Sequence, residues 1–171
     1  VNEEEQSLKG TFRLAVLPTI APYLLPRFFQ QLSEKHTDLD IRMLEMKTAP
    51  TMAALQNGEI DAAIIANQPT ESNLQGDILY YEQFFGYVAH NESIFKKDLI
   101  RTADINDERL WLLDEGHCFR DQLMRFCQME KVKVRQAAYR LGSLETFMRM
   151  VESGNGITFI PELATLQLSK E

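Results

Sequence analysis

Apolar residues in the first part of the chain follow two periods, one typical of strands and one typical of helices. Phe12, Leu14 and Val16 alternate with other positions, which predicts a strand. Behind Pro22, a residue tolerated near a helix start, the apolar positions recur at helical spacing. These positions are Leu24, Leu25, Phe28, Phe29 and Leu32. The pattern therefore predicts a strand followed by an amphipathic helix.

The next segments repeat this order. Ile41 and Met43 mark a second strand, and residues 52–56 suit a short helix that Asn57 and Gly58 close. Residues 62–66 form a short continuous apolar run, which is typical of a buried parallel strand. Strands that alternate with helices predict a βαβαβ unit with a parallel sheet and right-handed crossovers.

A second unit of strands and helices follows residues 79–81. Residues 84–89 predict a strand, residues 111–113 the end of a buried strand, and residues 134–139 a further strand. Ser143 suits the N-cap of a helix that stops at Gly154, and residues 156–160 return as a strand. The apolar face of that helix holds Leu144, Phe147, Met148 and Val151. The chain is therefore predicted to be an α/β protein.

The two cysteines of the chain, Cys118 and Cys127, stand nine positions apart in a stretch with helical apolar spacing. Nine helical residues rise about 13.5 Å and turn about 900°, which puts the side chains on opposite faces. A disulfide needs Cα atoms within about 4.4–6.8 Å of each other. Either these thiols never pair, or pairing unwinds the segment and links its fold to its oxidation state. The second case is the physical basis of a redox switch.

The surroundings of Cys118 favour a reactive thiol. Residues 114–116 predict a turn and the helix begins near Phe119, so Cys118 is expected at a helix start, where free N–H groups stabilise an anion. His117 and Arg120 add one potential and one permanent cation, and such settings lower the pKa of a cysteine. We assign Cys118 the attack on the oxidant and Cys127 the closure of the disulfide. The alternative is that both are small buried hydrophobic residues.

Composition limits the other classes of function. With 171 residues, 44% apolar and 25% charged, the chain has the make-up of a soluble protein of one domain or two small lobes. It holds no apolar run of membrane-spanning length and no signal peptide, so we expect no membrane contact. Two cysteines suit a reducing compartment, which predicts a cytoplasmic location. A net charge of −7 argues against binding of a phosphate backbone by this chain.

Metal and cofactor motifs do not fit. The spacing of Cys118 and Cys127 is not that of a structural zinc site. Residues 154–156 lack the third glycine of a dinucleotide fingerprint, and there is neither a phosphate loop nor a nucleophile-elbow serine. We therefore expect no metal, no cofactor and no enzymatic activity.

One segment is specific enough to indicate a family. Residues 116–121, Gly-His-Cys-Phe-Arg-Asp, together with Phe126 and Cys127, closely resemble the redox segment of the OxyR family, the peroxide sensors among the LysR-type transcriptional regulators. The resemblance runs from about Thr11 to Pro161 and includes residues 18–26. It also includes residues 58–65, 142–146 and 154–161, which are generic to LysR-type effector domains. The cysteine segment is what separates a peroxide sensor from a metabolite sensor.

The resemblance implies a fold and a domain organisation. It implies two Rossmann-like lobes with a cleft, as in periplasmic solute-binding proteins, and ligands of open α/β sheets bind outside the carboxyl ends of the strands. Residues 1–10 would be a linker remnant, residues 11–81 lobe I, and residues 82–171 lobe II with the redox cysteines. Family members run further, so we expect the C-terminal closing strand and helix to be absent, as is the DNA-binding helix-turn-helix.

The resemblance also implies a mechanism and partners. Hydrogen peroxide would oxidise Cys118 to a sulfenic acid, and Cys127 would close the disulfide, with changes in oligomer arrangement and in transcription of antioxidant genes. The implied partners are promoter DNA, further copies in a dimer or tetramer, RNA polymerase, and glutaredoxin or thioredoxin as reductant. The implied peroxide pocket is formed by Thr19, Thr48, His117, Arg120 and Asp121. For each threonine, a helix cap or a satisfied turn is the structural alternative.

Two other functions remain open at this point. A LysR-type effector domain could bind an organic metabolite in the cleft, with incidental cysteines, and slow or absent disulfide formation under micromolar peroxide would favour it. A thiol peroxidase would consume many equivalents of peroxide for each molecule of protein. The peroxide sensor is oxidised once per cycle.

Overall fold

The computed structural model describes residues 9–67, 73–105, 109–114, 116–127 and 142–168. The predicted strand over residues 134–139 and most of the predicted linker lie outside these residues. The chain divides into two compact units, unit 1 at Val1–Asp77 and unit 2 at Ile78–Glu171. Among the described residues, no helix combines the length and the apolar character that crossing a membrane would need.

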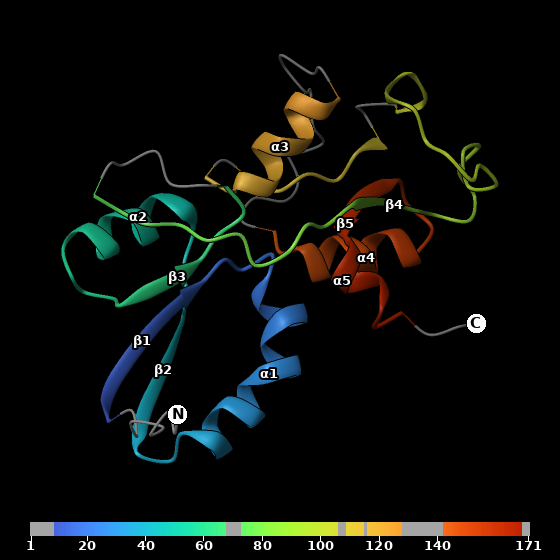
Figure 1. Ribbon diagram of the computed structural model, residues 1–171. Coiled ribbons are helices and arrows are strands. Elements are labelled where there is room, and N and C mark those ends of the chain that lie inside the picture. Colours follow the sequence, from blue (N-terminus) through green and yellow to red (C-terminus); the bar gives the residue numbers. More distant parts are fainter. Residues whose placement is uncertain (1–8, 68–72, 106–108, 115, 128–141, 169–171) are drawn as a thin grey trace. The chain divides into compact units, whose positions relative to one another are not determined.

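Unit 1 is a parallel sheet with two connecting helices. Strand β1 (Gly10–Val16) lies between β2 (Leu39–Glu45) and β3 (Ala62–Ile64) and is parallel to both. Helix α1 (Ala21–Lys35) leads from β1 to β2, and α2 (Thr48–Gln56) leads from β2 to β3 (Figure 1). The predicted βαβαβ order and its parallel pairing are confirmed.

Alternate residues of β1 build two separate cores. Leu14 and Val16 pack with Ala21 of α1, whereas Ala15 packs with Ala54 of α2. Because successive strand residues point to opposite faces, the two helices cover opposite faces of the sheet. The central strand is thus buried from both sides, which explains its apolar character.

Helix α2 is longer than the predicted residues 52–56, because it begins four residues earlier, at Thr48. The early start is compatible with Pro50, which lies in the first turn, where backbone N–H groups have no helical partner. Lys47 is the N-cap residue and makes no capping hydrogen bond through its side chain. As a result, Thr48 is the first helical residue.

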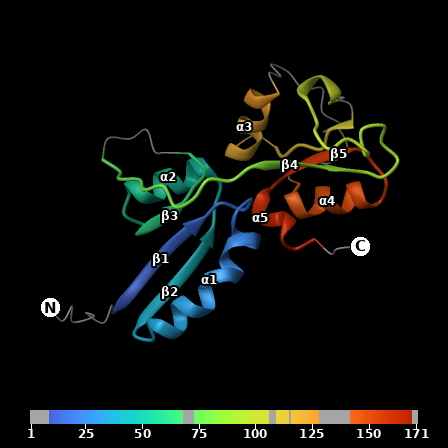
Figure 2. The ribbon, with the colours of Figure 1, turned by 45° about the vertical axis from the view of Figure 1, so that its right-hand side comes forward.

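Unit 2 has a different sheet. Strands β4 (Phe84–Val88) and β5 (Ile157–Pro161) pair antiparallel, unlike the strands of unit 1. Helix α4 (Leu144–Glu152) and the short α5 (Glu162–Thr165) contact this strand pair, and a 3₁₀ turn, η1, covers Thr102–Asp104. Helix α3 (Cys118–Phe126) lies on the other side of the pair from α4 (Figures 1 and 2). The predicted apolar face of α4 is buried as expected.

The segment before α3 runs beside β5 without forming a regular strand. Leu110 makes a single parallel bridge with Ile157, and the Trp111 N–H donates to the Ile157 carbonyl at 2.8 Å. The Thr158 hydroxyl donates to the Trp111 carbonyl at 3.0 Å. Residues 111–113 are buried as predicted, but the predicted strand there is wrong because only one bridge forms. These bonds hold the segment that precedes α3 beside β5.

The N-cap of α4 gives a direct test of this fold. The Ser143 hydroxyl accepts a hydrogen bond from the Thr146 N–H at 3.2 Å, as the sequence predicts. Ser143→Ala should lower the free energy of unfolding by about 1 kcal/mol, measured by urea denaturation. Ser143→Asp, which keeps a capping oxygen, should retain most of the stability. Equal losses in both variants would contradict the capping role.

Candidate functional site

Helix α3 carries one thiol at each end. Cys118 is its first residue, directly after the N-cap His117, and Cys127 is its C-cap. The cysteines are thiols with no disulfide between them, and both are buried, with 5% and 7% of their surfaces exposed. Helical rise over nine positions separates their Cα atoms by about 13.5 Å. The predicted helix between the two cysteines is confirmed.

The first turn of α3 is tied to the segment that precedes it. Arg120 Nη1 donates to the Leu113 carbonyl at 2.7 Å. His117 is buried, and its Nε2 lies 3.2 Å from Asp114 Oδ1. Cys118 is therefore flanked by an imidazole and a guanidinium that both have defined partners, at the positive end of the helix dipole.

Asp121 also belongs to this first turn. Its backbone N–H donates to the His117 carbonyl at 3.3 Å, and the residue is exposed. An acidic residue in the first helical turn interacts favourably with the dipole. The structure thus places His117, Arg120 and Asp121 within one turn of Cys118.

The environment of Cys127 disfavours its thiolate form. Burial raises the pKa of the Cys127 thiol above its ordinary value. Its backbone N–H donates to the Leu123 carbonyl at 2.8 Å, so the residue is held at the end of the helix. Because the thiolate is the attacking form, a raised pKa makes Cys127 a poor first nucleophile at neutral pH.

An aromatic contact joins α3 to the sheet of unit 2. The ring of Phe119 packs edge-to-face on Phe84 of β4, with centroids 4.9 Å apart and an angle of 77° between the ring planes. Phe119 is buried, and it directly follows Cys118. The sequence analysis missed Phe84, because a strand phenylalanine carries no local sign of the helix that it contacts.

The two predicted threonines belong to unit 1. Thr19 is buried in the turn between β1 and α1, and Thr48 begins α2. Both follow the carboxyl ends of neighbouring parallel strands, so they lie at the same edge of the sheet. Neither threonine is an N-cap, since these positions are Ile20 and Lys47. The helix-cap alternative is therefore wrong for both.

The Thr48 hydroxyl has an unusual environment. Its oxygen is buried and has no hydrogen-bond partner among the described residues. Leaving a buried polar group unpaired costs about 1–3 kcal/mol, and most such groups in folded proteins are paired. An orphaned hydroxyl at the strand ends of an α/β sheet marks a position that could bind a small polar ligand.

The structure gathers the predicted residues in two groups. His117, Cys118, Arg120 and Asp121 surround the start of α3, with Cys127 at its far end. Thr19 and Thr48 both follow strand ends at one edge of the sheet in unit 1. That both groups form one pocket stays a prediction. Within the described parts of the chain, no group of three or more His, Cys, Asp or Glu side chains could hold a metal ion.

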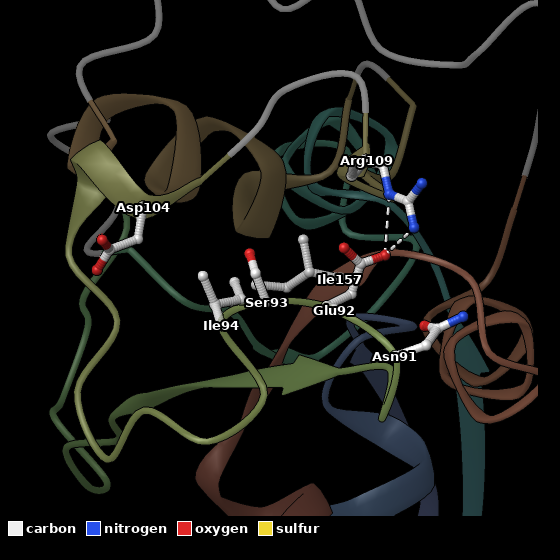
Figure 3. Close-up of a pocket in the computed structure, with 7 residues that line it drawn as sticks. All are labelled: Asn91, Glu92, Ser93, Ile94, Asp104, Arg109 and Ile157. Atoms are coloured by element: carbon white, nitrogen blue, oxygen red, sulfur yellow. Dashed lines mark hydrogen bonds and ion pairs between the residues drawn. The ribbon is translucent and has the colours of Figure 1, made fainter.

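A separate hollow of about 390 Å³ lies in unit 2 and is lined by Asn91, Glu92, Ser93, Ile94, Asp104, Arg109 and Ile157. Figure 3 shows Arg109 turned toward Glu92, with which it forms an ion pair. Glu92 also accepts from the Gly156 N–H at 3.0 Å, and Asp104 accepts from Lys97 at 2.6 Å. The charged groups of this hollow are thus engaged within the protein, and the lining includes none of the predicted site residues.

Comparison with known proteins identifies the family. The model of the LysR substrate binding domain matches residues 5–170. The chain belongs to this family. Within the family it is similar to hydrogen peroxide-inducible genes activators. It is 34% identical to a probable hydrogen peroxide-inducible genes activator from Mycobacterium leprae. The alignment spans 161 residues, which cover 94% of the chain and 52% of that protein.

A second relative is the DNA-binding transcriptional dual regulator OxyR of Escherichia coli. The two are 30% identical over 163 residues, which cover 95% of the chain and 53% of the regulator. This LysR substrate-binding domain therefore spans about half the length of the curated relatives that it matches. These relatives are transcription regulators.

Solved structures give the same assignment. A mutant OxyR from Porphyromonas gingivalis is 55% identical, with a TM-score of 0.88, over 94% of this chain and 73% of that one. The reduced OxyR regulatory domain from Pseudomonas aeruginosa is 31% identical, with a TM-score of 0.83, over 96% of this chain and 79% of that one. This LysR substrate-binding domain is thus of the OxyR type, as the cysteine segment predicts.

The raised pKa of Cys127 can be measured directly. In Cys118→Ser, Cys127 is the sole thiol, so the pH dependence of its alkylation by iodoacetamide reports its pKa. Since burial raises the pKa, the midpoint should lie above that of the same protein unfolded in guanidinium chloride. A midpoint at or below the unfolded value would contradict the assignment of Cys127 as the slower nucleophile.

Proposed function

We propose that this chain is the hydrogen peroxide-sensing regulatory domain of a LysR-type DNA-binding transcription factor. The observation that carries the proposal is the placement of two buried thiols at the ends of one nine-residue helix. The similarity to OxyR regulatory domains supports it.

The proposed chemistry has two steps. The Cys118 thiolate attacks peroxide, so that an S–O bond forms, the O–O bond breaks and hydroxide leaves. The Cys127 sulfur then attacks the sulfenic sulfur of Cys118, which forms the S–S bond and releases water once the departing hydroxide takes the thiol proton. The protein is oxidised once per cycle, which is the behaviour of a sensor and not of a peroxidase.

Closure of this bond must change the fold. The Cα atoms start about 13.5 Å apart and a disulfide holds them at about 5.5–6 Å, so α3 must unwind. The disulfide closes a ten-residue loop, and the chain entropy that it removes from the unfolded state stabilises the oxidised protein by about 3 kcal/mol. This free energy is comparable to the cost of unwinding a short helix. The remodelled segment would then change the oligomer arrangement and the transcription of antioxidant genes.

Five side chains of the two units are assigned to peroxide binding. Thr19 and Thr48 would hold peroxide or the departing hydroxide through their hydroxyls, and the orphaned oxygen of Thr48 supports this role. Arg120 and Asp121 would position the thiolate, and His117 would complete the pocket beside Cys118. Together these residues would stabilise the negative charge that moves from sulfur to oxygen.

The remaining partners belong to the whole transcription factor. We assign promoter binding to a helix-turn-helix outside this chain, since the net charge of −7 does not suit a phosphate backbone. We further propose assembly into dimers or tetramers, contact with RNA polymerase, a cytoplasmic location, and reduction by glutaredoxin or thioredoxin.

Brief exposure to peroxide tests the proposal. Mass spectrometry of the peroxide-treated wild type should map a Cys118–Cys127 crosslink at about one equivalent of peroxide. Cys118→Ser should show no oxidation, whereas Cys127→Ser should accumulate a sulfenic acid that dimedone traps. Wild-type protein that stays reduced under micromolar peroxide would instead favour a LysR effector domain that binds an organic metabolite.

Thr48 offers a second test. Thr48→Val removes the orphaned hydroxyl and keeps the shape, so peroxide should oxidise Cys118 about fivefold more slowly, the effect of one lost hydrogen bond. The free energy of unfolding should not fall, because the hydroxyl has no partner in the described structure. Thr11→Val, at an exposed strand position of unit 1, is the matched control and should react as the wild type does. An unchanged rate for Thr48→Val would remove Thr48 from the pocket.

A further inference from the structure

The contacts of α3 differ between its two ends. At the Cys118 end, Phe119 packs on Phe84 and Arg120 donates to the Leu113 carbonyl, so the first turn is joined to two other segments of unit 2. At the Cys127 end, two hydrogen bonds between described residues return to the helix itself. Arg125 Nε donates to the Asp121 carbonyl at 3.2 Å, and the Cys127 N–H donates to Leu123.

We propose that Phe84 is a positioning residue for disulfide closure, because its ring holds Phe119, and with it Cys118, in place while the Cys127 end of α3 unwinds toward Cys118. The inference rests on the proposed function. Beyond that function, the inference states which end of the helix moves, and it names the side chain outside the helix that determines this.

The geometry of the ring pair supports this role. A centroid distance of 4.9 Å and an angle of 77° are those of a favourable edge-to-face contact. Phe119 is 5% exposed and is adjacent in sequence to Cys118, so fixing its ring restricts the backbone that carries the reactive sulfur. Among the described residues this ring contact is at the Cys118 end of α3, and the proposal therefore places the start of unwinding at the Cys127 end.

Holding Cys118 in place matters because its sulfenic acid has two fates. Attack by Cys127 gives the disulfide and water. Attack on a second molecule of peroxide gives a sulfinic acid and water, which is irreversible without a dedicated repair enzyme. If Cys118 stays in place, Cys127 reaches its sulfenic sulfur sooner. The contact between the two rings should therefore raise the yield of the disulfide, which is the reversible product.

The test is the ratio of disulfide to sulfinic acid in the 171-residue protein under excess peroxide, measured by mass spectrometry. Phe84→Leu removes the ring contact and should shift this ratio about fivefold toward sulfinic acid. Phe85→Leu is the matched control, because Phe85 is the next residue of β4, points to the opposite face and is 42% exposed. It should keep the wild-type ratio, and so should Phe84→Tyr, which retains a ring.

Two further measurements separate positioning from a general loss of structure. The rate of sulfenic acid formation, followed by dimedone in a Cys127→Ser background, should be the same whether or not the protein also carries Phe84→Leu. In the wild type, NMR contacts between the rings of Phe84 and Phe119 should persist after oxidation. The Cys127 amide, bonded to Leu123 in α3, should lose its protection from hydrogen exchange.

Each outcome decides between the hypotheses. A wild type that forms no disulfide would overturn the proposed function itself. A wild type that forms it, with an equal product ratio in Phe84→Leu and Phe85→Leu, would overturn only the role of Phe84. Loss of the ring contacts on oxidation, with the Cys127 amide still protected, would overturn the assignment of the moving end.

Discussion

The rise of one α-helix is the constraint on which the rest of this structure depends. Cys118 and Cys127 lie at the two ends of α3, and as long as its backbone hydrogen bonds persist their sulfurs cannot meet. The helix is short, and helices of this length owe their stability mainly to packing against other elements. Oxidation chemistry and tertiary packing therefore act on the same few residues.

Elements of unit 2 hold α3, and elements of unit 1 carry the two threonines. The segment at Leu110 and Trp111, which precedes the helix, is bound to β5. Strand β4 supplies Phe84, which contacts the first turn. In unit 1, the parallel sheet carries Thr19 and Thr48 at one edge, so the loops after β1 and β2 present both hydroxyls from a rigid support.

Local patterns predicted much of this arrangement. The alternation of Phe12, Leu14 and Val16 indicated a strand, and the turn before Cys118 placed that residue at a helix start. The position of Ser143 as an N-cap was equally local. These features depend on backbone preferences within a few residues, which is why one sequence suffices to find them.

Features that depend on contacts between residues far apart in the chain could not be predicted from local sequence patterns. The antiparallel pairing of β4 with β5 joins segments about seventy residues apart, and the irregular course of residues 111–113 depends on β5. The contact of Phe84 with Phe119 and the orphaned oxygen of Thr48 are likewise set by packing. Only the resemblance of the cysteine segment to a known family indicated Thr19 and Thr48, since isolated threonines carry no chemical signature.

The burial of both cysteines has a consequence for selectivity. With 5% and 7% of their surfaces exposed, Cys118 and Cys127 present little area to any molecule in solution. Bulky hydroperoxides and protein thiols need a larger opening. Burial to this extent favours reaction of the two thiols with small molecules, and unwinding of the helix would expose the sulfurs to larger ones.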